Sequence, residues 1–98
     1  MKIEKIMPER TCSGLDLVIS KVLSKNTIMT RFGKKQVFKY DALDETGVVI
    51  LCFWKEDPDL ERGDRVRILA GYTNMYMNII NVNINDLNGV KIMRGKAS

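Results

Sequence analysis

Hydrophobic and polar residues alternate along most of the chain, and a period of two residues predicts β-strands. Five segments show this pattern: residues 15–23, 36–43, 48–54, 65–70 and 79–84. No segment shows the longer period of an extended amphipathic helix. The pattern therefore predicts an all-β protein built from short strands.

Polar and turn-forming residues separate the five segments. Residues 24–35 are expected to form a polar loop with Gly33 as a turn residue, and residues 44–47 ("DETG") are expected to form a tight turn. Residues 55–64 are rich in turn formers, with one helical turn expected after Pro58. In the first segment the alternation slips between Ile19 and Val22, which predicts a β-bulge. The tail, residues 90–98, is expected to add a short final strand.

The third segment is apolar on both faces. One face carries Val49, Leu51 and Phe53, and the opposite face carries Val48, Ile50, Cys52 and Trp54. Such a strand has to be covered twice, once by the core of its own domain and once by something else. What covers the second face is the main question that this sequence raises.

Five short antiparallel strands, the first of them bulged, indicate a small closed Greek-key β-barrel. The OB-fold matches this strand count best, and an SH3-like barrel has a similar count. With 98 residues, the chain is expected to form one domain over residues 1–98, with a core at about 13–86 and short extensions at both ends.

Composition narrows the possible functions. The chain carries 16 basic and 12 acidic residues, a balance compatible with a polyanionic partner. It has no histidine, and its two cysteines, Cys12 and Cys52, are too few for a zinc site or a disulfide scaffold. No spacing of a nucleophile and a base, phosphate-binding glycine loop or carboxylate cluster is present. We therefore expect no enzyme, no metal, no cofactor and no small-molecule substrate.

The N-terminal residues lack a hydrophobic stretch long enough for a signal peptide, and no segment approaches the length of a membrane span. The expected location is intracellular, either the cytoplasm or nucleoid of a prokaryote or a nucleus, with no membrane partner.

Four segments, in this order and spacing, resemble one family: "IMPERTCSGLDLVISKVL", "DETGVVILCFW", "LERGDRVRI" and "GYTNMYMNIINVNI". They are similar to the single-stranded DNA-binding OB-fold family, which includes archaeal single-stranded DNA-binding proteins, archaeal replication protein A domains and the small human single-stranded DNA-binding proteins. The resemblance covers about residues 3–86.

The resemblance implies that bases of single-stranded DNA or RNA stack on Trp54, Tyr72 and Tyr76. Basic residues expected on the same face would contact phosphates: Lys39, Arg65, Arg67, Arg31, Lys34 and Lys35. Stacking on aromatic rings and charge contacts to phosphates bind a strand with little dependence on its sequence. The first hypothesis is therefore a binding protein of DNA replication or repair.

The sequence departs from that family at the outer face of the third strand, which is polar in the relatives apart from its tryptophan. The fifth strand has Asn83 where the human relatives have an aromatic residue, and Met77 and Asn78 replace a basic residue and a glycine. A protein partner is therefore the alternative, docked on an apolar surface in a replication, repair or telomere complex. That surface would contain Val48, Ile50, Met75 and Met77.

Overall fold

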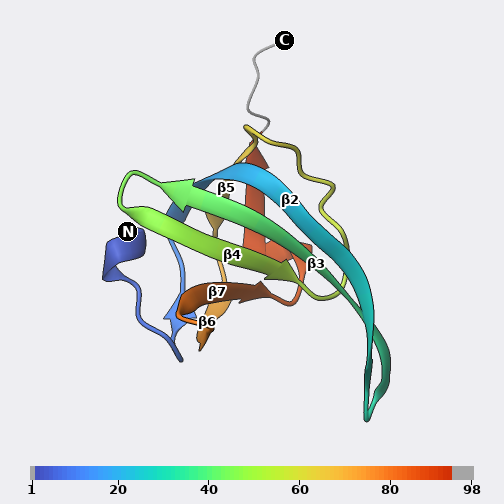
Figure 1. Cartoon of the computed structure of the whole chain (residues 1–98). Helices are drawn as coiled ribbons and strands as arrows, with labels where there is room; N and C mark the ends of the chain where they lie inside the picture. Colours follow the sequence, from blue (N-terminus) through green and yellow to red (C-terminus); the bar gives the residue numbers. More distant parts are fainter. Residues whose placement is uncertain (1, 94–98) are drawn as a thin grey trace.

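The computed structural model describes residues 2–93, and most of them belong to one curled β-sheet (Figure 1). Its strands are β1 (Thr11–Cys12), β2 (Leu15–Thr30), β3 (Gly33–Asp44), β4 (Gly47–Phe53), β5 (Arg65–Ile68), β6 (Gly71–Tyr76), β7 (Ile79–Ile84) and β8 (Val90–Met93). Two short 3₁₀ helices, η1 (Ile3–Lys5) and η2 (Leu87–Gly89), complete the described chain.

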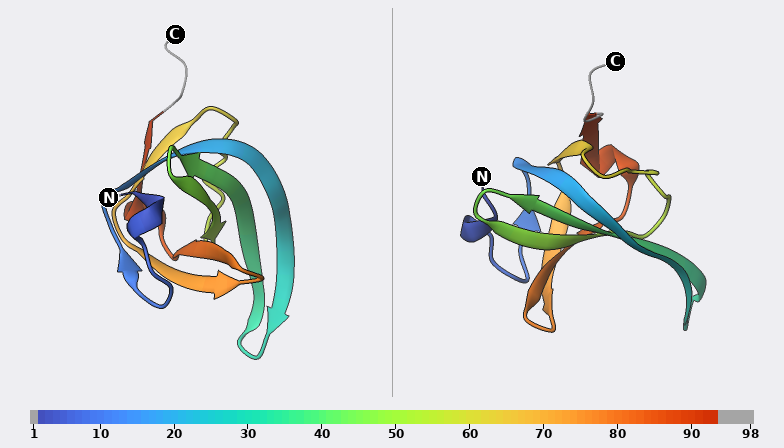
Figure 2. Two further views of the ribbon diagram at one scale, coloured as in Figure 1. Left: turned by 60° about the vertical axis from the view of Figure 1, so that its left-hand side comes forward. Right: turned by 45° about the horizontal axis from the view of Figure 1, so that its top comes forward.

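The sheet curls strongly, so that β5 and β6 come together without pairing. The strand order is β1-β6-β7-β4-β3-β2-β5-β8, so β5 and β6 stand near opposite ends of the sheet. Only Leu69 and Ala70 separate these two strands along the chain. The sheet must therefore curl until its ends meet, and the views in Figure 2 show the resulting barrel.

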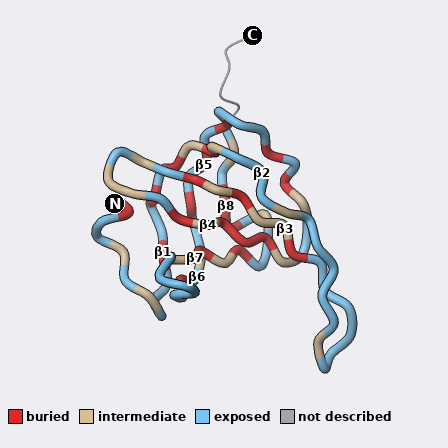
Figure 3. The backbone as a smooth tube through the Cα atoms, viewed as in Figure 1, coloured by how far each residue is buried: buried red, intermediate tan, exposed pale blue. Residues whose placement is uncertain are grey.

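The core consists of the inward positions of this barrel, as the alternation predicts. Val49, Leu51 and Phe53 are fully buried, and the ring of Phe53 packs edge-on against Tyr40 at a centroid distance of 5.7 Å. The buried positions in Figure 3 follow the curl of the barrel, whereas the projecting end of β2 and β3 is largely exposed. The expected inward and outward faces of the third segment are therefore confirmed.

One strand pairing differs from the antiparallel arrangement that the sequence predicts. β4 and β7 run parallel, with Leu51 opposite Val82 and Phe53 opposite Ile84, whereas the other pairs are antiparallel. The chain between these strands passes around the barrel through β5 and β6 before it returns. A connection of that length allows a parallel pairing, which no tight hairpin allows.

The prediction of a loop at residues 24–35 is wrong. β2 continues to Thr30 and β3 begins at Gly33, so these residues form a long hairpin that projects from the barrel (Figure 1). At its end the Thr30 Oγ1 accepts a hydrogen bond from the Phe32 amide and donates one to the Gly33 carbonyl. We call residues 24–39 the arm. The expected bulge is confirmed, since the register shifts between Ile19 and Lys21 and again before Ser24.

The prediction of a helical turn after Pro58 is also wrong, because residues 54–64 contain no helix. Side chains hold this connection instead. The Tyr40 hydroxyl donates to Asp57 Oδ1 at 2.5 Å and accepts from the Leu60 amide at 3.3 Å. Lys25 Nζ lies 2.7 Å from Asp57 Oδ2 and so ties the base of the arm to the same point.

The two ends of the described chain are built into the barrel. β1 pairs with β6, and Ile3 and Cys12 join the core. Both cysteines are free and buried. β8 confirms the expected short final strand, and the expected tail residues 94–98 lie outside the described part. No helix within residues 2–93 is long and apolar enough to span a membrane.

Asp44 connects the N-terminal segment to the turn before β4. Its Oδ1 accepts hydrogen bonds from the amides of Thr46 and Gly47, and its Oδ2 accepts from the Ile3 amide at 2.8 Å. Burial alone would raise the pKa of Asp44, but these hydrogen bonds hold it below its usual range. The stabilisation is therefore present at neutral pH and is lost as the pH falls through that lowered pKa.

We expect Asp44→Ala to lower the free energy of unfolding by about 1–3 kcal/mol at pH 7 because three amides lose their acceptor. Urea denaturation at pH 7 and at about pH 3 tests this, and the cost should be smaller at the lower pH. Glu56→Ala, at an exposed carboxylate, is the control and should change stability by less than about 0.5 kcal/mol. An equal cost of Asp44→Ala at both pH values would contradict the role given to the carboxylate.

Candidate functional site

The outer surface of β3, β4, β7 and β6 brings together the three aromatic candidates. Strand register places Tyr72 beside Asn83 and Asn83 beside Cys52. On the other side of β4, Cys52 lies beside Lys39. We call this surface the Trp54 face; its members are Lys39, Asp41, Ile50, Cys52, Trp54, Tyr72, Asn74, Tyr76, Asn81 and Asn83.

Asn83 fixes the indole of Trp54. Asn83 Oδ1 accepts a hydrogen bond of 2.9 Å from Trp54 Nε1. Its Nδ2 donates to the Tyr72 carbonyl at 3.0 Å and to Asn74 Oδ1 at 2.8 Å. Trp54 itself is half-buried, while the preceding Phe53 is fully buried. One edge of the indole is thus anchored to the sheet, and part of the ring system remains open to a ligand.

Tyr72 and Tyr76 extend this surface along β6. They are four residues apart on one strand and therefore point to the same side. Their exposed fractions are 44% and 63%, so neither ring serves the core. The hairpin from β6 to β7 turns at Met77 and Asn78, both with positive φ, as a two-residue type I′ turn requires. Both tyrosines are therefore available for contact on an exposed hairpin.

The arm carries the basic candidates to different sides. Phe38 pairs with Phe53 on the inner side, so Lys39 and Lys35 lie on the outer side with Cys52. Lys34 lies on the opposite side of the arm, and Arg31 stands at its tip. In the right view of Figure 2 the β6–β7 hairpin projects downward from the barrel and the arm projects to the right, and β4 lies between them in the sheet.

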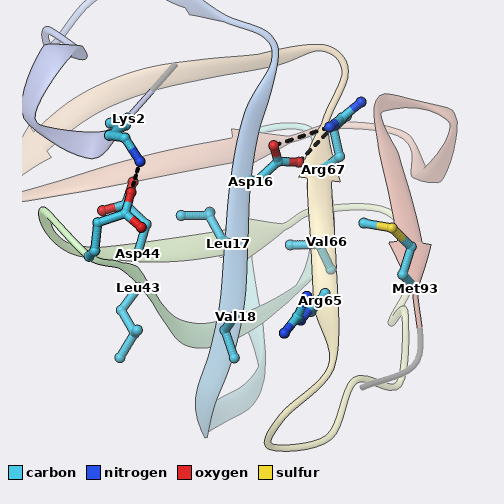
Figure 4. A pocket seen from close by; sticks show the side chains of 11 residues that line it. Lys2, Asp16, Leu17, Val18, Leu43, Asp44, Arg65, Val66, Arg67 and Met93 are labelled. Atoms are coloured by element: carbon cyan, nitrogen blue, oxygen red, sulfur yellow. Dashed lines mark hydrogen bonds and ion pairs between the residues drawn. The ribbon is translucent and has the colours of Figure 1, made fainter. Parts of the chain in front are cut away.

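Arg65 and Arg67 are not brought to the Trp54 face. Their strand, β5, is separated from β4 by β3 and β2 in the sheet. Arg67 donates to both oxygens of Asp16 at 2.7 and 3.2 Å, which lowers the pKa of Asp16. Both arginines line a separate pocket of about 780 Å³ together with Met93 (Figure 4). The expectation that they share a face with the aromatic residues is therefore wrong.

The apolar candidates give a partial answer to the question of what covers the outer face of β4. Cys52 is buried, and its Sγ lies 3.7 Å from Asn81 Oδ1 of β7. Ile50 is half-buried, whereas 54% of Val48 is exposed. Met75 and Met77 are exposed on the β6–β7 hairpin. Side chains of the sheet itself thus cover the middle of β4 and leave its beginning open.

Sequence reasoning missed Phe32, which lies at the tip of the arm with 83% of its surface exposed. The sequence did contain a signal for an exposed aromatic residue here. Phe32 lies between Arg31 and Gly33, in a short polar segment flanked by basic residues, and no neighbouring apolar residues could bury it. Within residues 2–93, no group of histidine, cysteine, aspartate or glutamate side chains is arranged to hold a metal ion.

The chain is similar in structure to OB-fold domains of archaeal proteins. It matches a domain of replication protein A from Methanococcus maripaludis with a TM-score of 0.76 and 20% identity, over 96% of this chain and 94% of that chain. The second OB-fold domain of that organism's replication protein A matches with a TM-score of 0.77 and 20% identity, over 100% and 96% of the two chains. The replication factor A related protein from Methanobacterium thermoautotrophicum matches with a TM-score of 0.77 and 19% identity, over 95% of this chain and 89% of that chain.

No protein-family model matches the sequence, and no curated protein matches it. The likeness in structure nevertheless extends over nearly the whole of both chains in each comparison. It decides between the two barrel types that strand count alone leaves open. The chain has the all-β OB fold.

Proposed function

We propose that this protein binds single-stranded DNA without catalysing a reaction, with RNA as the alternative ligand. The observation that carries the proposal is the Trp54 face, where Trp54, Tyr72 and Tyr76 lie on one continuous outer surface beside Lys39. Bases would stack on the aromatic rings, each contributing about 1–3 kcal/mol. Lys39 and Lys35 would contact phosphates along the same path.

The similar structures support a role in replication or repair. Two of them are structures of a replication protein A domain from one organism, and a third is a replication factor A related protein. The proposed partners are therefore single-stranded nucleic acid and other replication or repair proteins inside the cell.

Titration with oligo-dT, followed by tryptophan fluorescence, tests this function directly. Trp54 is the sole tryptophan, so quenching reports a base at one known position. With roughly three to five phosphate contacts, the affinity should fall with a log–log salt slope of about −2 to −3.5. Unchanged emission and no retention of labelled oligonucleotide at micromolar protein would refute the proposal.

Lys35 and Lys34 provide a matched pair of substitutions on the arm. Lys35 lies on the side of the Trp54 face, and Lys34 lies on the opposite side. We expect Lys35→Glu to weaken binding of oligo-dT about 5- to 10-fold at low salt and to reduce the salt slope by about 1. Lys34→Glu changes the net charge equally and should have a smaller effect, which fluorescence anisotropy of a labelled oligonucleotide measures. Equal losses would mean that only the net charge matters.

A protein-binding role is the second candidate, and the exposure of Val48 favours it. In β3, Leu43 pairs with Val48 and is also exposed, so an apolar strip borders the Trp54 face. Met77, at the turn of the β6–β7 hairpin, would extend this strip into an adaptable protein contact. Met75 does not share this surface, because it alternates with Tyr76 along β6 and points to the opposite side of the strand. The same titration separates the two roles. A protein that leaves Trp54 emission unchanged with oligo-dT but self-associates, and no longer does so in Val48→Asp, would favour the second.

A further inference from the structure

The asparagine side chains of the Trp54 face are engaged within the sheet. Asn83 uses both amide donors and accepts from Trp54. Asn81 donates to the Ile79 carbonyl at 3.2 Å and contacts the Cys52 thiol through Oδ1. An amide group has two donor hydrogens and one acceptor oxygen, so little capacity remains to recognise the edge of a base. This face would therefore contact the rings of bases and discriminate weakly among them.

A pocket of about 410 Å³ adjoins this face at the end of β7. Tyr72 and Asn83 line it and also belong to the Trp54 face. The rest of its side-chain lining includes Asn85, Asp86 and Asn88. A base that leaves the stack at Tyr72 would enter this pocket next. We call it the asparagine pocket.

The backbone around the asparagine pocket is fixed by hydrogen bonds. Asp86 Oδ1 accepts from the Asn88 amide at 2.9 Å, and the Gly89 amide donates to the Asp86 carbonyl at 2.8 Å. The Gly89 carbonyl in turn accepts from the amides of Leu69 and Ala70, at the junction of β5 and β6. The pocket is therefore formed before any ligand arrives, which reduces the entropy cost of binding.

The side-chain amides of Asn85 and Asn88 differ from those of Asn81 and Asn83. Both residues are exposed, and within residues 2–93 neither side-chain amide has a hydrogen-bond partner. Asp86 adds a carboxylate, whose Oδ2 lies 4.0 Å from Lys55 Nζ. The asparagine pocket thus offers one aromatic ring, two open amides and a carboxylate acceptor.

We propose that the asparagine pocket binds one base of the strand and prefers adenine. This inference rests on the proposed function. An asparagine amide matches the donor and acceptor on adenine N6 and N7, and the Asp86 carboxylate favours a base with an amino group. Thymine has no amino group, so it would be the weakest occupant. The same carboxylate disfavours a phosphate in the pocket, while Tyr72 supplies a ring on which a base stacks.

The test compares oligo-dT of about 12 nucleotides with a series in which one dT is replaced by dA at each position in turn. We expect one position to bind about 5-fold more tightly with dA, measured by competition in fluorescence anisotropy. The double variant Asn85→Ala/Asn88→Ala should lose that preference and keep the affinity for oligo-dT within about twofold. Asn26→Ala, an exposed asparagine on the arm, is the control and should retain the preference.

Each outcome of this test has a distinct meaning. Binding of oligo-dT with quenching of Trp54, but with equal affinity for every dA position, overturns the adenine pocket and leaves the proposed function standing. A preference that persists in the double variant overturns the assignment to Asn85 and Asn88. No binding of any oligonucleotide overturns both proposals. Because the readout is a ratio of two affinities, a variant that is merely less stable does not imitate the expected result.

Discussion

Replacement of Trp54 by alanine is expected to weaken binding of oligo-dT by about 1–3 kcal/mol, or about 5- to 150-fold. The indole is the largest aromatic surface on the Trp54 face. Its Nε1 already donates a hydrogen bond of 2.9 Å to Asn83 Oδ1. The ring therefore loses little freedom when a base stacks on it, and most of the stacking free energy appears as affinity. Fluorescence anisotropy of a labelled oligonucleotide measures the loss, since this variant has no tryptophan.

Two controls separate stacking from folding in this experiment. Trp54→Phe keeps an aromatic ring and should recover part of the affinity, although it loses the hydrogen bond to Asn83. Thermal unfolding shows whether Trp54→Ala retains the fold, as we expect for a half-buried residue outside the inner core. A folded Trp54→Ala protein with unchanged affinity, combined with a large loss in Phe32→Ala, would place the binding surface on the arm instead.

The sequence predicted the inner face of each core strand because burial imposes alternation. Leu15, Leu17 and Ile19 of β2 are buried, and so are the three inward residues of the third segment, Val49, Leu51 and Phe53. The arm was missed for the same physical reason. Both of its faces are largely exposed, so no alternation marks residues 24–35 as strands, and their polar composition is typical of a loop.

The positions of Arg65 and Arg67 show a second limit of the pattern. Alternation states whether a side chain points into a barrel or out of it, but every direction around the barrel counts as outward. Only the strand order places β5 away from β4, and that order depends on long-range pairings. The role of Asn83 was hidden in a similar way. In the sequence, Asn83 only marks a position where related proteins have an aromatic residue. The structure shows that it lies beside Tyr72 and accepts a hydrogen bond from Trp54.

Tyr40→Phe is expected to lower the free energy of unfolding by about 1–3 kcal/mol, because the hydroxyl bonds to Asp57 and to the buried Leu60 amide. For a domain of this size the melting temperature should fall by roughly 5–15 °C. Burial alone would raise the pKa of Asp57, but bonds from Lys25 and Tyr40 hold it below its usual range. The stabilisation is therefore lost as the pH falls, and Tyr40→Phe should cost less at about pH 3 than at pH 7.

Tyr76→Phe removes the same hydroxyl from an exposed tyrosine and is the matched control, with an expected change below about 0.5 kcal/mol. The Tyr40 side chain points into the barrel, on the opposite side of β3 from Lys39, so its loss should leave the affinity for oligo-dT within about twofold. Trp54→Ala should show the reverse pattern, with reduced affinity and retained stability. If Tyr40→Phe instead weakened binding as strongly as Trp54→Ala, the anchor that joins Asp57 to Lys25 would have to control the position of the arm on the ligand.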